Sequence, residues 1–171
     1  MYLIDIDIID ALSNGVDSLL MKKERKTPAA LHTFLIMLRA SHSMARYLLP
    51  PILKAGLGDS DFRVLHVLIE NGPTPVNGIG PKVHLNPGSI SVAVDRLFKK
   101  GLVRRVESES DRRIRTVSIT EEGRELFLPL FREQGALVER AFQDLSLEER
   151  AQLEDMLKRI GRRAESLAET P

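Results

Sequence analysis

The chain has no cysteine and no apolar run close to the length of a membrane span. Without cysteine it can hold no disulfide framework, no thiol-based redox sensor and no cysteine-ligated zinc. A helix that spans a bilayer needs about 20 apolar residues. Asp5, Asp7 and Asp10 stand where a signal peptide carries positive charge. We therefore expect a cytoplasmic protein without a membrane partner.

The patterns of an enzyme are also missing. Four histidines are scattered without the spacing of metal ligands: His32, His42, His66 and His84. No nucleophile stands beside a paired acid and base. Gly78 and Gly80 do not open a dinucleotide fingerprint, because Pro81 follows them and no strand precedes them. The sequence thus predicts no catalysis, no cofactor and no metal.

What remains is an ordinary globular composition with an uneven charge. Of the 171 residues, 43% are hydrophobic and 29% charged, which suits one domain or a small domain with a helical appendage. The net charge is +1, but Val76–Thr120 carries nine Lys or Arg against four acids and leaves −4 for the rest. A basic module in an acidic frame indicates binding to a polyanion, although a solvated basic face is the plain alternative.

Apolar periodicity predicts helices through most of the chain. The expected helices are 2–24 (weakened by Asn14-Gly15), 28–49, one that opens at Gly58-Asp59 and stops at Asn71-Gly72-Pro73, 87–100, one from Thr120 towards Asp144, and 147–167. Pro50-Pro51 should end or kink the second helix, and Pro129 should kink the long one or delay its start. Around Val76–Leu85, the glycines and Pro81 argue against a regular helix beyond one turn.

The stretch GLVRRVESESDRRIRTVSIT at 101–120 predicts a β-hairpin with a polar tip. It follows directly on a helix that has Asn86 as its cap, Pro87 at its first position and Gly101 as its stop. One face of that helix is apolar, and the opposite face carries Ser91, Val92, Asp95, Arg96 and Lys99. A helix followed by a hairpin with arginines at its tip is the layout of a winged helix-turn-helix.

The segments LGDSDFRVLHVLIENGP and NPGSISVAVDRLFKKGLVRRVESESDRRIRTVSITEEGRELF resemble the MarR family of bacterial transcription regulators. The resemblance covers roughly Leu57 to Phe127, and VDRLFKKGLVRR followed by DRRIRTVSITEEG carries it most strongly. It extends more weakly over the flanking helices, while the first 26 residues look like an extension. It implies a mainly α fold with a small β-hairpin wing, in which a winged helix-turn-helix lobe joins a helical dimerisation region.

The resemblance further implies a homodimer on double-stranded DNA. We expect N-terminal dimerisation helices in 1–56, the DNA-binding lobe in 57–120, and C-terminal dimerisation helices in 121–171. The sequence supports this independently, because the apolar stripes of the outer helices exceed what a lobe of about 70 residues could cover. A monomer that folds these helices back on itself is the alternative.

Residue by residue, the resemblance places the helix Pro87–Lys100 in the major groove. The implied DNA-binding residues are Ser89, Ser91, Val92, Arg96, Lys99, Arg112, Arg113 and Arg115. Arg113 matches the position that reaches the minor groove, and Asp111 matches the acid that orients the wing, with Arg96 as its partner or a phosphate contact. Relatives often have Thr-Arg where this chain has Ser91-Val92, so their operators do not transfer.

Two questions stay open in the sequence. A winged helix can also serve protein–protein contact or bind DNA architecturally with weak specificity. The basic helix face argues against the first, and the small reading side chains keep the second open. On the helix 28–49, Arg39, His42 and Arg46 share a face where the family often binds small aromatic anions. A solvated or ion-paired cationic face is the simpler explanation of these three residues.

Overall fold

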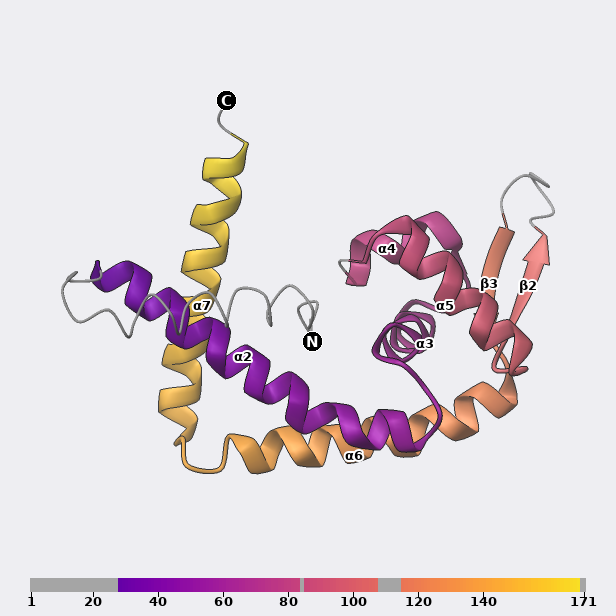
Figure 1. Ribbon diagram of the computed structural model, residues 1–171, viewed down its shortest axis with the longest axis horizontal. Coiled ribbons are helices and arrows are strands. Elements are labelled where there is room, and N and C mark those ends of the chain that lie inside the picture. The colour runs from indigo at the N-terminus through magenta and orange to yellow at the C-terminus, as the bar shows by residue number, and fades with distance from the viewer. Residues whose placement is uncertain (1–27, 84, 108–114, 170–171) are drawn as a thin grey trace, which may run out of the picture. The chain divides into compact units, whose positions relative to one another are not determined.

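The computed structural model describes residues 28–83, 85–107 and 115–169 (Figure 1). The helix expected at 2–24 and the wing tip with Asp111, Arg112 and Arg113 lie outside the described residues. The described elements, in chain order, are α2 (Ala29–Lys54), α3 (Asp59–Asn71), β1 (Thr74–Pro75), α4 (Val76–Val83), α5 (Pro87–Lys99), β2 (Val103–Glu107), β3 (Arg115–Ile119), α6 (Glu121–Ala141) and α7 (Leu147–Ala168). The predicted fold class, mainly α with a small β wing, is confirmed.

The predicted caps set several of these helix ends. The Asn86 side chain accepts a hydrogen bond from the backbone N–H of Ser89 at 2.8 Å and begins α5. Ser146 and Glu149 form the expected capping box of α7. In that box, the hydrogen bond that the Ser146 backbone donates to Glu149 lowers the pKa of the Glu149 carboxyl. Gly101, with φ of 72°, ends α5 in the left-handed conformation that favours glycine.

The prediction of no regular helix around Val76–Leu85 was wrong. Helix α4 runs over eight residues with Pro81 inside it. Ile79, Gly80 and Val83 are buried, so packing outweighs the weak local propensity. Pro81 lacks the N–H that would bond to the carbonyl of Asn77, but both residues are exposed, so water can take that place.

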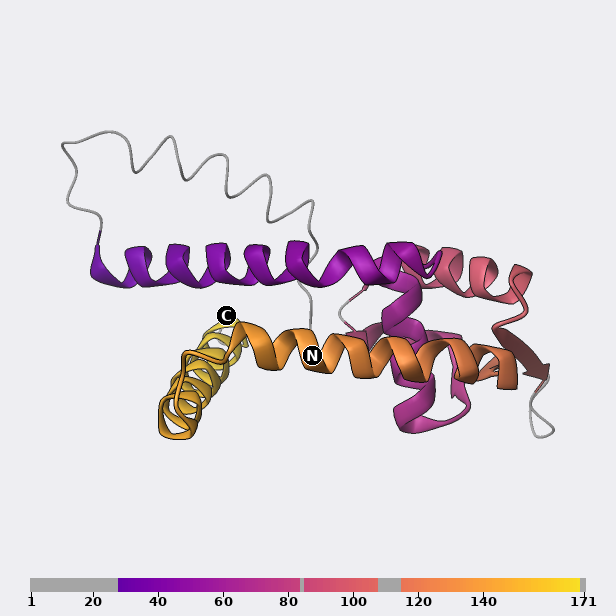
Figure 2. The ribbon, with the colours of Figure 1, turned by 90° about the horizontal axis from the view of Figure 1, so that it is seen from below.

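At the prolines of the long helices, neither the expected end nor the expected late start occurs. Helix α2 continues past Pro50 and Pro51 to Lys54, so it does not end at the proline pair (Figure 2). Helix α6 begins at Glu121 and runs through Pro129, so the delayed start did not occur. The Gln134 side chain on α6 donates to the backbone carbonyl of Leu48 on α2 at 3.0 Å and ties the two helices together next to the proline pair.

The sheet has the strand order β1-β3-β2, and both pairings are antiparallel. Strands β2 and β3 form the predicted hairpin, with Val103 opposite Ile119 and Arg105 opposite Val117. The short strand β1 was not predicted, because a two-residue strand that contains Pro75 has no sequence periodicity. It fixes the start of α4 against the wing.

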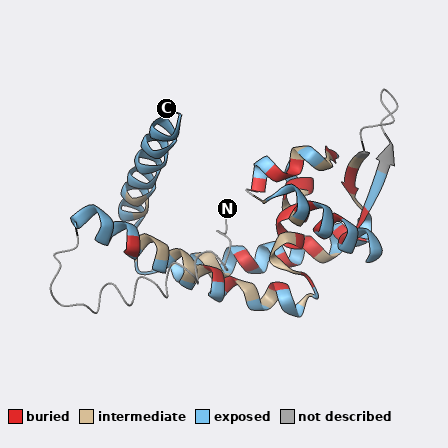
Figure 3. Ribbon diagram, turned by 45° about the horizontal axis from the view of Figure 1, so that its top comes forward, coloured by how far each residue is buried: buried red, intermediate tan, exposed pale blue. Residues whose placement is uncertain are grey.

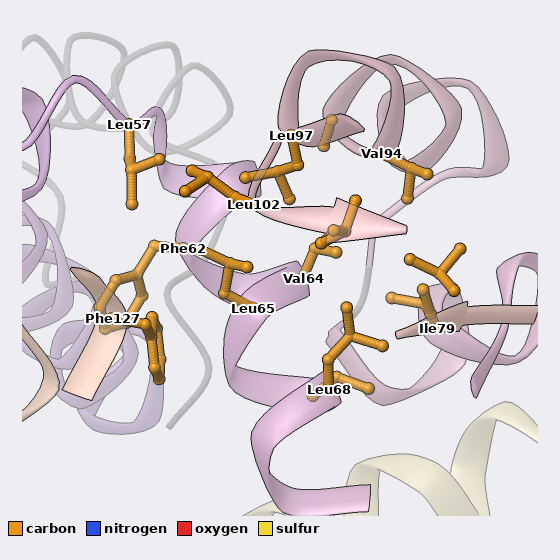
Figure 4. Close-up of a cluster of buried hydrophobic side chains, with 14 of the residues drawn as sticks. Leu57, Phe62, Val64, Leu65, Leu68, Ile79, Val94, Leu97, Leu102 and Phe127 are labelled. Carbon is orange, nitrogen blue, oxygen red and sulfur yellow. The ribbon is translucent and has the colours of Figure 1, made fainter. Parts of the chain in front are cut away.

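A single buried cluster holds the lobe together. Its members come from α2 to α6 and include Ile52, Leu65, Ile79, Leu97 and Phe127. Figure 4 shows the side chains of α3 at the centre of this cluster, with Phe62 beside Phe127 at a ring-centroid distance of 5.0 Å. The cluster therefore extends beyond the 57–120 segment expected for the lobe, because α2 and α6 each contribute to it.

The start of α6 lies unusually close to the turn after α5. A Cβ atom on Gly123 would come within 2.1 Å of the Leu102 carbonyl oxygen, so only glycine fits here. Thr120 strengthens the junction by donating its hydroxyl to the Gly101 carbonyl at 2.7 Å and accepting from the Gly123 N–H at 3.1 Å. These contacts fix where the hairpin leaves the lobe relative to α5.

By its internal contacts, the chain divides into a unit that ends at Gln134 and a second unit from Gly135 onward. In the second unit, α7 has no buried residue (Figure 3). Arg150 joins α7 to the end of α6 by donating to the Glu139 carboxylate at 2.8 Å and to the carbonyls of Phe142 and Leu145. Over the described ranges, no helix combines the length and apolarity needed to cross a membrane.

Candidate nucleic-acid interface

Helix α5 divides cleanly into a buried face and an exposed face. Ile90, Ala93, Val94 and Leu97 are buried in the lobe core. The exposed face presents Ser91, Val92, Asp95 and Lys99, with Ser89 half-buried beside them. Because the buried face packs into the lobe core, α5 is held in place and its exposed face has a fixed position.

The N-terminal half of this surface is small and weakly polar. The Ser91 hydroxyl donates to the Pro87 carbonyl one turn earlier at 3.0 Å, which leaves its oxygen able to accept. Val92 is 53% exposed and offers an apolar group of the size that contacts a thymine methyl. Of the three expected base-reading residues, Ser91 and Val92 are therefore exposed and Ser89 is half-buried.

Arg96 does not extend freely from this surface. Its guanidinium contacts Asp61 and Ser60 at the start of α3, with an Nη2–Oδ1 distance to Asp61 of 2.8 Å. The sequence predicted Asp111 or a phosphate as its partner, and Asp61 was missed. Asp111 lies outside the described residues, so a contact between it and Arg96 stays a prediction.

A second pair that sequence reasoning missed joins α5 to the hairpin. Arg105 on β2 forms an ion pair with Asp95, and its guanidinium carbon lies 5.3 Å from the ring centroid of the exposed Phe98. The chain reversal at Gly101 brings these residues together. Opposite charges ten residues apart were a weak signal, because only the turn makes them neighbours.

The remaining hairpin residues are described in part. Arg104 donates from Nε to the Ser118 hydroxyl at 3.0 Å across the β2–β3 ladder. Arg115 begins β3, but its side chain is outside the described residues. The structure therefore shows the two strands of the wing. The expected contacts of Arg112, Arg113 and Arg115 stay predictions.

The three residues proposed for an effector stand on α2. Arg39 and Arg46 are exposed and His42 is half-buried. Their spacing of three and four residues places them along one side of the helix. Within residues 28–83, 85–107 and 115–169, no group of three His, Cys, Asp or Glu residues is arranged to hold a metal ion.

Comparison with known proteins connects this geometry to a family. The family model described as MarR family matches residues 57–114. The HTH-type transcriptional regulator MhqR of Bacillus subtilis is 36% identical over 135 residues, which cover 79% of this chain and 93% of that protein.

Solved structures agree with the fold. A probable transcriptional regulator from Pseudomonas aeruginosa superposes with a TM-score of 0.64 at 30% identity, over 75% of this chain and 96% of that one. CouR from Rhodococcus jostii RHA1, solved with p-coumaroyl-CoA bound, gives a TM-score of 0.66 at 26% identity, over 75% and 90% of the two chains. With its exposed helix α5 and adjoining hairpin, this chain belongs to the MarR family and is a DNA-binding transcription regulator.

Proposed function

We propose that this regulator acts as a homodimer on a pseudo-palindromic operator, with α5 of each subunit in a major groove. The observation that carries the proposal is the division of α5 into a core-packed face and an exposed face with small side chains near its N-terminus. In helix-turn-helix proteins, the N-terminal residues of the recognition helix contact base edges. Ser89 and Ser91 can hydrogen-bond to bases, and Val92 suits a thymine methyl.

Basic residues around this face supply the contacts to the DNA backbone. Lys99 is exposed one turn or more beyond the reading residues, and Arg105 on β2 pairs with Asp95 of the same helix. Arg112 and Arg115 are proposed to meet phosphates, and Arg113 to enter the minor groove. A narrow A·T-rich minor groove concentrates negative potential and attracts arginine through shape rather than a unique base code.

The dimer is proposed from apolar surface that the single chain leaves uncovered. On α7, Met156, Leu157, Ile160 and Leu167 are exposed at spacings of three, four and seven. On the N-terminal half of α2, Leu31 and Phe34 are exposed as well. Exposed apolar surface on a helix marks an interface, and a twofold dimer is the most common way to cover it.

The regulator is further proposed to be a cytoplasmic repressor that a small anionic or aromatic ligand releases from DNA. Support comes from Arg39, His42 and Arg46 along one side of α2, and from the aromatic thioester bound by the similar protein CouR. Such a ligand can shift the equilibrium only as far as it prefers the conformation that does not bind DNA. If aromatic carboxylates neither bind nor alter DNA affinity at millimolar concentration, this part of the proposal fails.

Selection of binding sites from genomic DNA, followed by binding titrations, tests the proposal. We expect a palindrome with half-sites about one helical turn, ~34–36 Å, apart. Affinity should fall steeply with salt as counterions are released. Equal affinity for every duplex would instead support weakly specific architectural binding. A salt-independent or absent interaction would support a role in protein–protein contact.

A further inference from the structure

The first turn of α3 carries a buried carboxylate. Asp61, on the first turn of α3, is 1% exposed although it is charged. Its Oδ2 atom accepts a hydrogen bond from the backbone N–H of Gly58 at 2.9 Å. A buried carboxylate is costly unless a cation and further donors compensate it.

Arg96 of the recognition helix supplies that compensation. Its Nε and Nη2 atoms donate to Asp61 Oδ1 at 3.1 and 2.8 Å, and Nη2 also donates to the Ser60 hydroxyl at 2.9 Å. A guanidinium held through two of its nitrogens on one carboxylate is fixed in direction as well as position. The contact therefore restrains how α5 is rotated about its axis.

Lys100 adds a second restraint one turn later on the same helix edge. Its ammonium donates to the backbone carbonyl of Gly56 in the α2–α3 connection. The two anchor points on α5 are four residues apart, or about 6 Å along the helix axis. Two points on one edge resist rotation and sliding together, whereas a single point would act as a pivot.

Asp95, the residue before Arg96, restrains α5 separately through its ion pair with Arg105. This pair joins α5 to the hairpin, whereas Arg96 joins it to the start of α3 and Lys100 joins it to the α2–α3 connection. Base readout requires side chains placed to within about half an ångström, so these restraints matter for it.

We infer that Arg96 is a positioning residue for sequence recognition, acting through Asp61 and Ser60, rather than a contact to the DNA backbone. With Lys100 it sets the rotation of α5 that brings Ser89, Ser91 and Val92 to the base edges. The inference rests on the proposed placement of α5 in the major groove. It assigns the buried Asp61 a role in DNA recognition although Asp61 cannot touch DNA.

A positioning role predicts that Arg96 and Asp61 affect specific binding to the operator but not non-specific binding to other DNA. A residue that contacts a phosphate contributes to binding of every duplex and to the salt dependence. A residue that only orients the helix contributes to the operator alone. Loss of Arg96 or Asp61 should therefore lower selectivity and leave the slope of log affinity against log salt unchanged.

The experiment measures binding of the full chain to its selected operator and to an unrelated duplex across a salt series. Arg96→Gln and Asp61→Asn should each weaken operator binding by about tenfold or more, the scale of one lost base contact. Binding to the unrelated duplex should change by less than about twofold, with the salt slope of the wild type. Arg96→Lys should restore part of the selectivity, since it retains the charge but not the two-nitrogen contact.

Lys99→Gln is the matched control on the same helix, because Lys99 is a basic residue on its exposed face. It should weaken both duplexes alike and reduce the salt slope by about one. The same behaviour in Arg96→Gln, together with wild-type selectivity in Asp61→Asn, would overturn the inference and make Arg96 a phosphate contact.

The milder variants Ser60→Ala and Lys100→Met keep the inference testable if the Asp61 and Arg96 variants do not fold. Each removes one contact that holds this side of α5 and should lower selectivity by a few-fold. The positioning role of Arg96 requires this decrease. Unchanged selectivity in both would refute it. If the wild type itself shows no operator preference, the proposed function fails; normal wild-type preference with unchanged variants rejects the positioning role alone.

Discussion

The lobe and helix α7 differ in how much of their apolar surface the chain itself buries. Both have amphipathic helices, but the lobe buries its apolar faces in one cluster that draws on α2 to α6. In α7 no residue is buried, and only Arg150 and Leu153 are half-buried. An apolar stripe thus indicates that a face will be covered, but not whether the same chain covers it.

The contrast also separates what holds each region in shape. The lobe is stabilised by its buried apolar side chains, and its charged contacts orient α5 relative to α3 and the hairpin. Helix α7 depends on its capping box, on Arg150, and on exposed i,i+4 pairs such as Arg159 with Asp155 at 3.6 Å. Such exposed pairs contribute only about 0.3–0.5 kcal/mol each, so they cannot replace a covered apolar face.

The largest expected effect on this comparison comes from the same substitution in the two regions. Leu65 is fully buried, and Leu65→Ala should lower the free energy of unfolding by about 2–5 kcal/mol through lost burial and a cavity. Leu147 at the start of α7 is 82% exposed, and Leu147→Ala should cost less than about 0.5 kcal/mol. Denaturant titration of both variants measures the difference, and similar costs would contradict the contrast.

The next effect concerns DNA rather than stability. Arg113→Ala should weaken operator binding by roughly 1–3 kcal/mol, the scale of a strong groove contact, without altering the dimer. The matched control is Lys158→Ala, because Lys158 is a basic residue on α7 away from the hairpin in sequence. Titration of both variants against the operator decides: equal affinities would remove the wing from the mechanism and favour a role in protein–protein contact.

A smaller effect is expected at the cap of the recognition helix. Asn86→Ala removes the acceptor for the Ser89 N–H and should cost about 1 kcal/mol of stability. Operator binding should weaken as well, because Ser89 and Ser91 stand on the first turns of the same helix. Asn86→Asp, which retains an acceptor, serves as the control. A thermal melt that leaves Asn86→Ala at the wild-type midpoint would rule out the cap's contribution.

The smallest effect is a pH dependence at His66. Burial lowers the pKa of His66 below its ordinary 6.5, and the nearby Glu70 carboxylate opposes this shift only in part. The unfolded chain therefore binds the proton more readily, so stability should decline as pH falls below about 6.5. His66→Phe, which preserves stacking on Phe131, should show less of this decline. Parallel stability curves for the two proteins would exclude His66 as the source.

Much of this architecture follows from local sequence signals. The capping residues Asn86 and Ser146, the stop at Gly101 and the hairpin strands were predicted where they occur. In each of these cases the physical cause lies within a few residues along the chain. The exposed face of α5 followed from periodicity for the same reason, except that the apolar Phe98, expected on the buried side, is exposed.

What the sequence could not predict depends on contacts between distant segments. Helix α4 forms because its buried residues pack against neighbouring helices, which outweighs Gly78, Gly80 and Pro81. The partners of Arg96 lie 35 and 36 residues away, and no spacing rule connects them. The Asp95–Arg105 pair likewise requires the chain reversal. These tertiary contacts, rather than the helices themselves, determine how the candidate DNA-binding face is oriented.

The most direct test of dimerisation through the exposed apolar face of α7 is sedimentation of the wild type and of the double variant Leu157→Glu with Ile160→Glu. The wild type should sediment as a dimer at micromolar concentration, and the double variant should dissociate or unfold. Ala151→Glu with Arg162→Glu, on the opposite side of the helix by its spacing, should leave the dimer intact. A folded wild-type monomer at micromolar concentration would contradict the account.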